Sequence, residues 1–301
     1  MELWIPITIG AALAQNFRFM LQKHLKATRL STGGATFARF LFSAPLVALL
    51  LWGYTSSGGH SLPETSARFW GFALVGALSQ ILATMCVVAL FAERNFAVGI
   101  TFKKTEVLQT AFVGFLILGE GISRGGLLAI LVGFVAVVLL SDSSKSSGAS
   151  GISRFFNRAS GLGVLSGILF AFSAVGYRGA SLSLGDLDFF LRSCFTLSCV
   201  TASQTIAMAI WLSAKERGQI TKVLSNWRIG IMVGLTSMLG SLGWFTAFTL
   251  QNAAYVKALG QVELIFSFLA TVFIFKEKST GRELIAMALL CLSIILLIFL
   301  K

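Results

Sequence analysis

Charged residues are scarce in this sequence. Lysine, arginine, aspartate and glutamate make up 12% of its 301 residues, whereas a soluble domain carries about 25%. Hydrophobic residues make up 56%. A soluble globular enzyme is excluded, because so little charge cannot cover a surface that faces water. The composition predicts an integral membrane protein.

Side chains that bind metals or act as nucleophiles are also scarce. The only two histidines, His24 and His60, fall in expected loops, and the four cysteines lie in apolar runs without a CxxC spacing. The sequence has no phosphate-loop pattern, and a Ser/His/Asp set cannot be placed at one membrane depth. We therefore expect no enzyme activity, no bound metal and no cofactor.

Acidic residues are half as numerous as basic ones, 12 against 24, which gives a formal net charge of +12. In a soluble protein this excess would suggest nucleic-acid binding. Here most lysines and arginines lie in short segments between apolar runs. Such a distribution is typical of membrane orientation, so we expect a lipid bilayer and no nucleic acid as partner.

Long apolar runs dominate what the sequence does contain. A membrane-spanning helix needs about 20 apolar residues, and ten runs qualify: 3–21, 34–54, 69–91, 95–118, 125–141, 161–180, 187–213, 229–249, 252–275 and 283–300. A Ser- and Gly-rich segment at 142–160 separates two groups of five. We expect an all-α integral membrane protein with ten transmembrane helices, divided into a first five-helix repeat (1–141), a linker (142–160) and a second five-helix repeat (161–301).

The two halves match at a spacing of 157 residues, the distance from Glu106 to Glu263. Residues 95–120 read NFAVGITFKKTEVLQTAFVGFLILGE, and residues 252–277 read NAAYVKALGQVELIFSFLATVFIFKE. Glu120 falls on Glu277 at the same spacing. Glutamate is rare in this chain, so the paired glutamates indicate an internal duplication. With five spans per half, the two copies would lie in opposite orientations.

The basic residues agree with an inverted repeat. Loops after the odd-numbered runs hold most lysines and arginines, whereas loops after the even-numbered runs hold only Arg68 and Arg124. The positive-inside rule then places the odd loops in the cytoplasm and both termini outside. We expect a multi-pass protein of a bacterial cytoplasmic (inner) membrane, as a monomer or homodimer.

The ends of the two halves carry a family resemblance. Each half closes with an apolar run, a glutamate, a short polar link and a last apolar span: LILGEGISRGGLLAILVGFVAVVLL and VFIFKEKSTGRELIAMALLCLSIILL. This arrangement resembles the ten-helix, EamA-type members of the drug/metabolite transporter superfamily. The resemblance implies an inverted-repeat bundle in which spans 1–4 and 6–9 surround a central cavity and spans 5 and 10 lie at the periphery.

Glu106 and Glu263 are the first candidates for a functional site. Each lies about halfway along its run, and a charged residue at the centre of a membrane helix costs about 2.5–3.5 kcal/mol. One interpretation is a proton- or cation-coupling pair that faces a shared cavity. The alternative is a structural ion pair, because Lys103 lies three residues before Glu106 on the same helical face. We expect Glu120 to have a structural role at the end of its span.

Other polar and aromatic residues on the runs extend the expected substrate site. Lys103 and Lys104 differ in direction by about 100° on a helix, so they cannot face one point. Arg39 and Arg192 match between the halves at a slightly different spacing, and the alternative for both is snorkelling to the interface. The whole expected set is Lys103, Lys104, Glu106, Lys257, Gln261, Glu263, Arg39, Arg192, Gln80, Trp244 and Tyr255.

These residues predict a secondary transporter that moves a small polar metabolite by alternating access. A site with both carboxylates and cations suits an amino acid or related zwitterion, with possible proton coupling through Glu106 and Glu263. Lysines on the fourth and ninth spans also resemble the organophosphate-translocator branch, although Lys257 does not fall on Lys103 or Lys104 under the repeat. An exchanger of organophosphates or nucleotides therefore stays an alternative, as does a receptor or assembly factor without transport.

Overall fold

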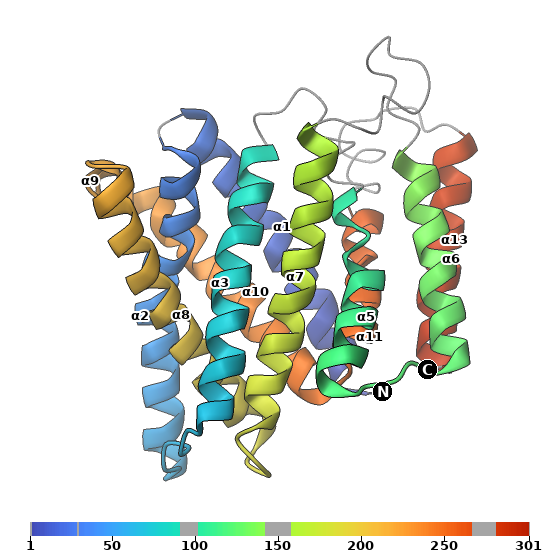
Figure 1. Cartoon of the computed structure of the whole chain (residues 1–301), viewed down its shortest axis with the longest axis horizontal. Coiled ribbons are helices and arrows are strands. Elements are labelled where there is room, and N and C mark those ends of the chain that lie inside the picture. The colour runs from blue at the N-terminus through green and yellow to red at the C-terminus, as the bar shows by residue number, and fades with distance from the viewer. Residues whose placement is uncertain (1, 29, 91–101, 142–157, 267–280, 301) are drawn as a thin grey trace.

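A computed structural model describes residues 2–28, 30–90, 102–141, 158–266 and 281–300 (Figure 1). The regular elements in these ranges are α-helices. In chain order they are α1 (Trp4–Thr28), α2 (Thr32–Gly58), α3 (Ala67–Leu90), α5 (Glu106–Leu118), α6 (Arg124–Ser141), α7 (Arg158–Leu182), α8 (Phe189–Lys215), α9 (Gln219–Ser225), α10 (Trp227–Leu250), α11 (Ala253–Leu259) and α13 (Gly281–Leu300).

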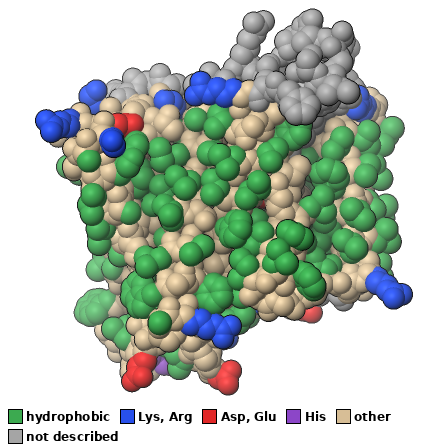
Figure 2. Space-filling model, viewed as in Figure 1, with side chains coloured by type: hydrophobic (Ala, Val, Ile, Leu, Met, Phe, Trp, Pro, Cys, Tyr) green, Lys and Arg blue, Asp and Glu red, His purple; other side chains and the backbone are tan. Residues whose placement is uncertain are grey.

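The helices form a membrane bundle. Within the described ranges, α2, α3, α7, α8 and α10 are each long and apolar enough to cross a bilayer, and α5, α6 and α13 contain shorter apolar helices. Large apolar side chains such as Trp52, Phe112 and Phe299 are exposed on the outside. Hydrophobic side chains cover the middle of the face in Figure 2, whereas most Lys and Arg side chains lie along its upper edge. This is the surface of a multi-pass integral membrane protein.

Helices of the first half pack against helices of the second half. The helix α3 packs on α7, α1 on α10, α2 on α8, and α6 on α13. Exchanging the halves (α1 with α7, α2 with α8, α3 with α10, α6 with α13) interchanges the α3–α7 and α1–α10 contacts and leaves the α2–α8 and α6–α13 contacts as they are. In Figure 1, α2 runs downward and α8 upward, while α6 runs upward and α13 downward. The pair α6–α13 lies at the right edge of the bundle.

Two predicted spans are interrupted, which corrects the expectation of continuous helices over 95–118 and 252–275. In the described part of the first, the helix breaks at Lys104 and Thr105 before α5 begins at Glu106. In the second, α11 ends at Leu259 and the chain turns at Gly260 and Gln261. At the 157-residue spacing the two breaks overlap at one position, where Lys104 falls on Gln261. Residues 95–101 and 267–275 lie outside the described residues.

The break in the second half has a steric cause and a tight backbone. A Cβ atom on Gly260 would lie 2.5 Å from the Trp244 ring, so only glycine allows this close approach. The Gln261 and Glu263 amides bond to carbonyls three residues earlier, which is the tighter 3₁₀ pattern. Hydropathy detects apolar length but not such turns, so the sequence alone did not reveal the breaks.

Helix ends also differ from the apolar runs. The helix α1 continues to Thr28 beyond the expected end at 21, and α7 begins at Arg158 inside the expected linker. The short helix α9 lies in a segment expected to be a loop. Polar helix ends extend past the apolar part of a span, and hydropathy reports only the apolar part.

Asp188 begins α8 as an N-cap. Its carboxylate accepts hydrogen bonds from the amides of Phe190 and Leu191, both at 3.0 Å, and from the Tyr54 hydroxyl at 3.0 Å. Partial burial acts to raise the pKa of Asp188, but the hydrogen bonds from Leu191, Tyr54 and Phe190 outweigh it and lower the pKa below its ordinary value. The cap therefore needs the ionised carboxylate.

Candidate functional site

Seven charged side chains are buried where the two halves meet. Their exposed fractions range from 1% to 8%. Five are cations and two are carboxylates: Arg18, Arg39, Lys103, Lys104, Lys257, Glu106 and Glu263. Such groups are rarely buried unless they are paired or hydrogen-bonded, so their partners decide what this region can do.

Glu106 stands at the first position of α5, directly after the helix break. Its Oε1 lies 3.5 Å from the Lys103 Nζ and 3.7 Å from the Lys257 Nζ. Its Oε2 is buried and has no hydrogen-bond partner among the described residues. The pair with Lys103 confirms the helical-face prediction, and Lys257 adds a partner from the other half.

Glu263 occupies the equivalent place in the second half. It forms an ion pair with Lys104, and its Oε2 accepts a hydrogen bond from the Gln15 side chain at 3.4 Å. Lys103 and Lys104 thus pair with different carboxylates, as their directions on the helix predict. Each glutamate therefore contacts a lysine of the opposite half, which ties the two breaks together.

Lys257 is held mainly by aromatic rings. Its Nζ lies 5.3 Å from the centre of the Phe170 ring, 5.1 Å from that of Trp244 and 5.9 Å from that of Phe248. These are cation–π distances. The Glu106 oxygen at 3.7 Å is beyond hydrogen-bonding distance. Across the described part of the chain, the Lys257 ammonium has no acceptor within 3.5 Å.

Arg39 is bound only by neutral groups in the described ranges. Its Nη1 donates to the Thr84 hydroxyl at 3.0 Å, and its Nη2 donates to the Ser241 hydroxyl at 3.3 Å. With its amide oxygen turned toward Arg39, Gln80 accepts from both nitrogens at 2.9 and 3.0 Å, and its amide nitrogen then donates to Ser173. This buried guanidinium therefore has no carboxylate partner among the described residues.

Arg39 and Lys257 line the same cavity between the halves. The space in it that a water molecule can enter has a volume of about 30 Å³, and its walls come from α1, α2, α3, α7, α10 and α11. Besides the two cations, the polar wall includes Gln15, Gln80 and Ser173, and the apolar wall includes Trp244. Neither glutamate forms part of this lining. The cavity is thus a polar space that presents two positive groups.

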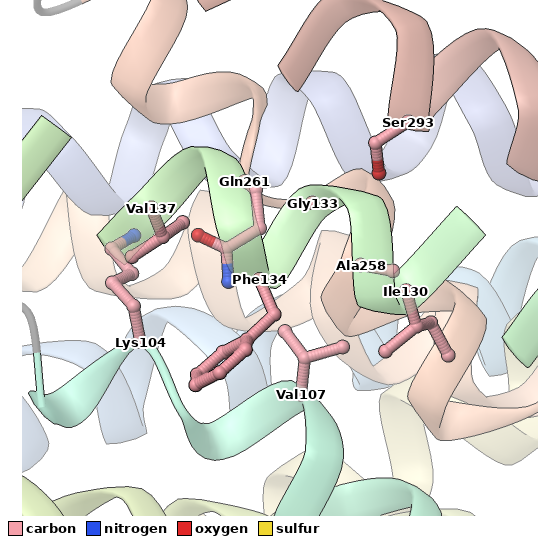
Figure 3. Close-up of a pocket in the computed structure, with 9 residues that line it drawn as sticks. All are labelled: Lys104, Val107, Ile130, Gly133, Phe134, Val137, Ala258, Gln261 and Ser293. Carbon is pink, nitrogen blue, oxygen red and sulfur yellow. The ribbon is translucent and has the colours of Figure 1, made fainter. Parts of the chain in front are cut away.

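A second pocket lies where α5 and α11 meet α6 and α13. Figure 3 shows Lys104 and Gln261 side by side there, next to Val107 and Phe134. The Gln261 Oε1 is buried and has no hydrogen-bond partner within the described residues. The structure therefore brings Lys104 and Gln261 together, but away from the cavity that Arg39 and Lys257 line.

Two expected site residues lie elsewhere. The Tyr255 hydroxyl accepts a hydrogen bond from the Ser123 amide at 2.9 Å and so joins α11 to the start of α6. The Arg192 Nη1 donates to the Gly185 carbonyl at 3.0 Å near the start of α8. Neither side chain lines the central cavity. Ser173 and Ser241 are cavity residues that the sequence did not single out, because serines are common on all the apolar runs.

Arg178 joins three helices at the end of the bundle away from the linker. Its Nε donates to both Glu120 oxygens, at 2.6 and 2.9 Å. Its Nη1 donates to the carbonyls of Phe248 and Gln251, at 2.6 and 2.8 Å. This network ties the C-terminal ends of α5 and α10 to α7, and it gives Glu120 the structural role expected from the sequence.

The comparison with known proteins agrees with this architecture. The model of the EamA-like transporter family matches residues 2–142. Residues 2–142 therefore carry the EamA domain of this family. EamA-like transporters belong to the drug/metabolite transporter superfamily, so the protein is a membrane transporter and not an enzyme.

Solved structures share the fold of this EamA-like transporter. One of 29 matching chains, described only as a crystal structure of a protein, superimposes with a TM-score of 0.74. The match covers 100% of this chain and 97% of the other at 12% sequence identity. Identity this low supports the fold alone. No curated protein matches the sequence.

Proposed function

We propose that this EamA-like transporter exchanges small anionic metabolites across the membrane through the cavity between its halves. The observation that carries the proposal is that two buried cations line this cavity: Arg39, whose partners in the described ranges are neutral, and Lys257, whose ion pair with Glu106 is 3.7 Å long. A carboxylate or phosphate of a substrate would supply the missing acceptor.

The charge balance favours an anion over the zwitterion expected from the sequence. Two cations, Arg39 and Lys257, and no carboxylate line the cavity among the described residues, so the lining carries an excess of positive charge. Uncompensated charge in a low-dielectric interior is unfavourable. An amino acid adds no net charge and leaves this excess unchanged, whereas each negative charge of a substrate reduces it. Organic anions therefore fit the site better than neutral amino acids.

Alternating access would use the two halves as moving units. The reciprocal packing of α3 on α7 and α1 on α10, with opposite helix directions, supports an inverted repeat with the expected boundaries 1–141, 142–160 and 161–301. The cavity is lined by both halves, so rocking one against the other would open it to either side. The Arg178 network would close the end away from the linker. The basic end would face the cytoplasm of a bacterial cell.

Exchange of one anion for another follows from the same excess of positive charge in the cavity lining. An empty cavity would carry its two lining cations through the change of state, whereas an anion would balance part of that charge. The loaded form therefore reorients more easily, and a second anion is needed for the return. Glu106 and Glu263 already have lysine partners, so we propose anion exchange as the coupling in place of the expected proton transfer.

Counterflow in proteoliposomes tests this function. Vesicles are loaded with unlabelled succinate, glycerol 3-phosphate or alanine, and uptake of the same labelled compound is measured. We expect counterflow with at least one of the two anions and none with alanine. Counterflow with alanine alone would refute the anion proposal, and solute binding without counterflow would indicate a receptor. Loss of pH-driven uptake in Glu106→Gln and Glu263→Gln would favour proton coupling through these glutamates over anion exchange.

A zwitterionic amino acid is the second candidate. The faces of Phe170, Trp244 and Phe248 attract an ammonium group, and the Glu106 Oε2 has no partner among the described residues. In this structure the Lys257 ammonium already occupies that environment. A substrate ammonium would have to displace it, which is why we place this candidate second.

A further inference from the structure

We propose that the substrate carries two anionic groups, one at each end, and that Arg39 binds one end while Lys257 binds the other. This inference rests on the proposed anion transport and adds the chemical class of the anion: a dicarboxylate, or an acid with a phosphate at its far end. It follows from the way in which the two cations reach the cavity.

The two cations enter from different sides of the bundle. Arg39 lies on α2, at the left of Figure 1, and Lys257 lies on α11, to the right of centre. Arg39 contacts Thr84 and Ser241, whereas Lys257 contacts the rings of Phe170, Trp244 and Phe248. The two groups share no partner. Each can therefore bind an anionic group of its own.

The two points also differ in chemistry. The Arg39 guanidinium is a planar fork that can bind a carboxylate through two parallel hydrogen bonds, and its present partners are neutral and exchangeable. The Lys257 ammonium is a compact charge held by ring faces, with its donors free of any acceptor within 3.5 Å in the described chain. Both side chains are more than nine-tenths buried and both line the cavity. Each can thus receive its own anionic group.

Charge balance again favours this class. A substrate with one negative charge balances one of the two cations that line the cavity, whereas a doubly charged substrate balances both. Because buried charge is costly, the second anionic group should contribute to binding and not merely be tolerated. A substrate of this kind should also show an optimum length, since its ends must reach two fixed points.

A length series measures this optimum. Malonate, succinate, glutarate and adipate are each compared with the monocarboxylate of the same carbon number as competitors of counterflow, at a pH of about 7.5 where all the carboxyl groups are ionised. We expect one dicarboxylate to compete about ten- to a hundredfold better than its monocarboxylate, the range for a charged hydrogen bond. The comparison of 3-phosphoglycerate with glycerol 3-phosphate repeats the test with a phosphate at one end.

Two variants locate the ends. Arg39→Gln and Lys257→Gln should each remove the preference for the dicarboxylate over its monocarboxylate, since only one of the two cations remains. Arg192→Gln is the control, because Arg192 matches Arg39 in the repeat but lies outside the cavity. Arg39→Lys, which keeps the charge, separates loss of binding from loss of folding, and size-exclusion profiles monitor all four proteins.

The outcomes separate this inference from the proposed function. If every dicarboxylate and its monocarboxylate compete equally in the wild type, the two-ended substrate is refuted while anion transport stands. If Arg192→Gln removes the preference as strongly as Arg39→Gln, the assignment of the ends is refuted. If no anion of either series competes, the proposed function fails, and this inference fails with it.

Discussion

Removing the carboxylate of Glu263 would leave one lysine charge isolated inside the protein. Lys104 is 5% exposed, and its ion pair is with Glu263. The substitution Glu263→Gln keeps the shape of the side chain but removes its charge. Breaking a buried ion pair by removing one partner costs about 3–5 kcal/mol, because the other charge stays buried without compensation. We expect the free energy of unfolding to fall by this amount.

The double variant Lys104→Met/Glu263→Gln supplies the decisive comparison. Replacing both members of a buried pair is often nearly neutral or stabilising. We therefore expect the second substitution to restore most of the stability lost in Glu263→Gln. Unfolding is followed by circular dichroism of the purified protein in mixed micelles with increasing SDS. Glu64→Gln, a change at an exposed loop carboxylate, should alter the free energy by less than about 0.5 kcal/mol.

The reasoning fails if Glu263→Gln is as stable as the wild type, because Lys104 would then not depend on this carboxylate. It also fails if the double variant is less stable than the single variant. In that case the lysine charge would be balanced by another group, and the reciprocal pairing between the halves would not be the interaction that joins the two helix breaks.

Two further substitutions test the packing and a helix end. Gly176→Ala would place a Cβ atom 2.9 Å from the Phe72 carbonyl oxygen where α7 crosses α3, so we expect the free energy of unfolding to fall by about 1–3 kcal/mol in the same assay. Gly71→Ala is the control, because its added atom meets nothing within 4 Å, and it should lose no stability. Equal losses in the two variants would contradict the close approach of α7 to α3. Asp188→Ala removes the α8 cap and should lower stability by about 1 kcal/mol at neutral pH, with Asp186→Ala as control. The pKa of Asp188 is lowered in the folded protein. The cap therefore stabilises the protein above the ordinary aspartate pKa, and this stabilisation should disappear as the pH falls through the lowered pKa. A stability loss in Asp188→Ala that is the same in acid as at neutral pH would contradict this prediction.

Helical periodicity predicted only the local part of the site. Lys103 and Glu106 are three residues apart, and their ion pair is present at 3.5 Å although the helix breaks between them at Lys104 and Thr105. The different directions of Lys103 and Lys104 also followed from the helix period. In contrast, the pairing of Lys257 with Glu106 and of Lys104 with Glu263 joins residues more than 150 positions apart, and no local rule could have indicated it.

Matching positions in the two halves did not imply matching environments. Arg39 and Arg192 correspond in the sequence, yet Arg39 lines the cavity and Arg192 bonds to a loop carbonyl near the start of α8. Gln261 follows Lys257 by about one helical turn, yet it faces the other pocket because the helix breaks at Gly260. Small differences in where a helix breaks or how it crosses a neighbour decide which side chains meet.

The amino-acid sequence by itself determined the apolar lengths of the helices, the uneven distribution of basic loops, the repeated glutamates and the resemblance to EamA-type transporters. These properties depend on composition and on distances along one chain segment. Only the tertiary structure decided where two spans break, which lysine meets which glutamate, and which cations face the cavity. Those features depend on the tilt and contact of helices that are far apart in the chain, and hydropathy and periodicity carry no information about either.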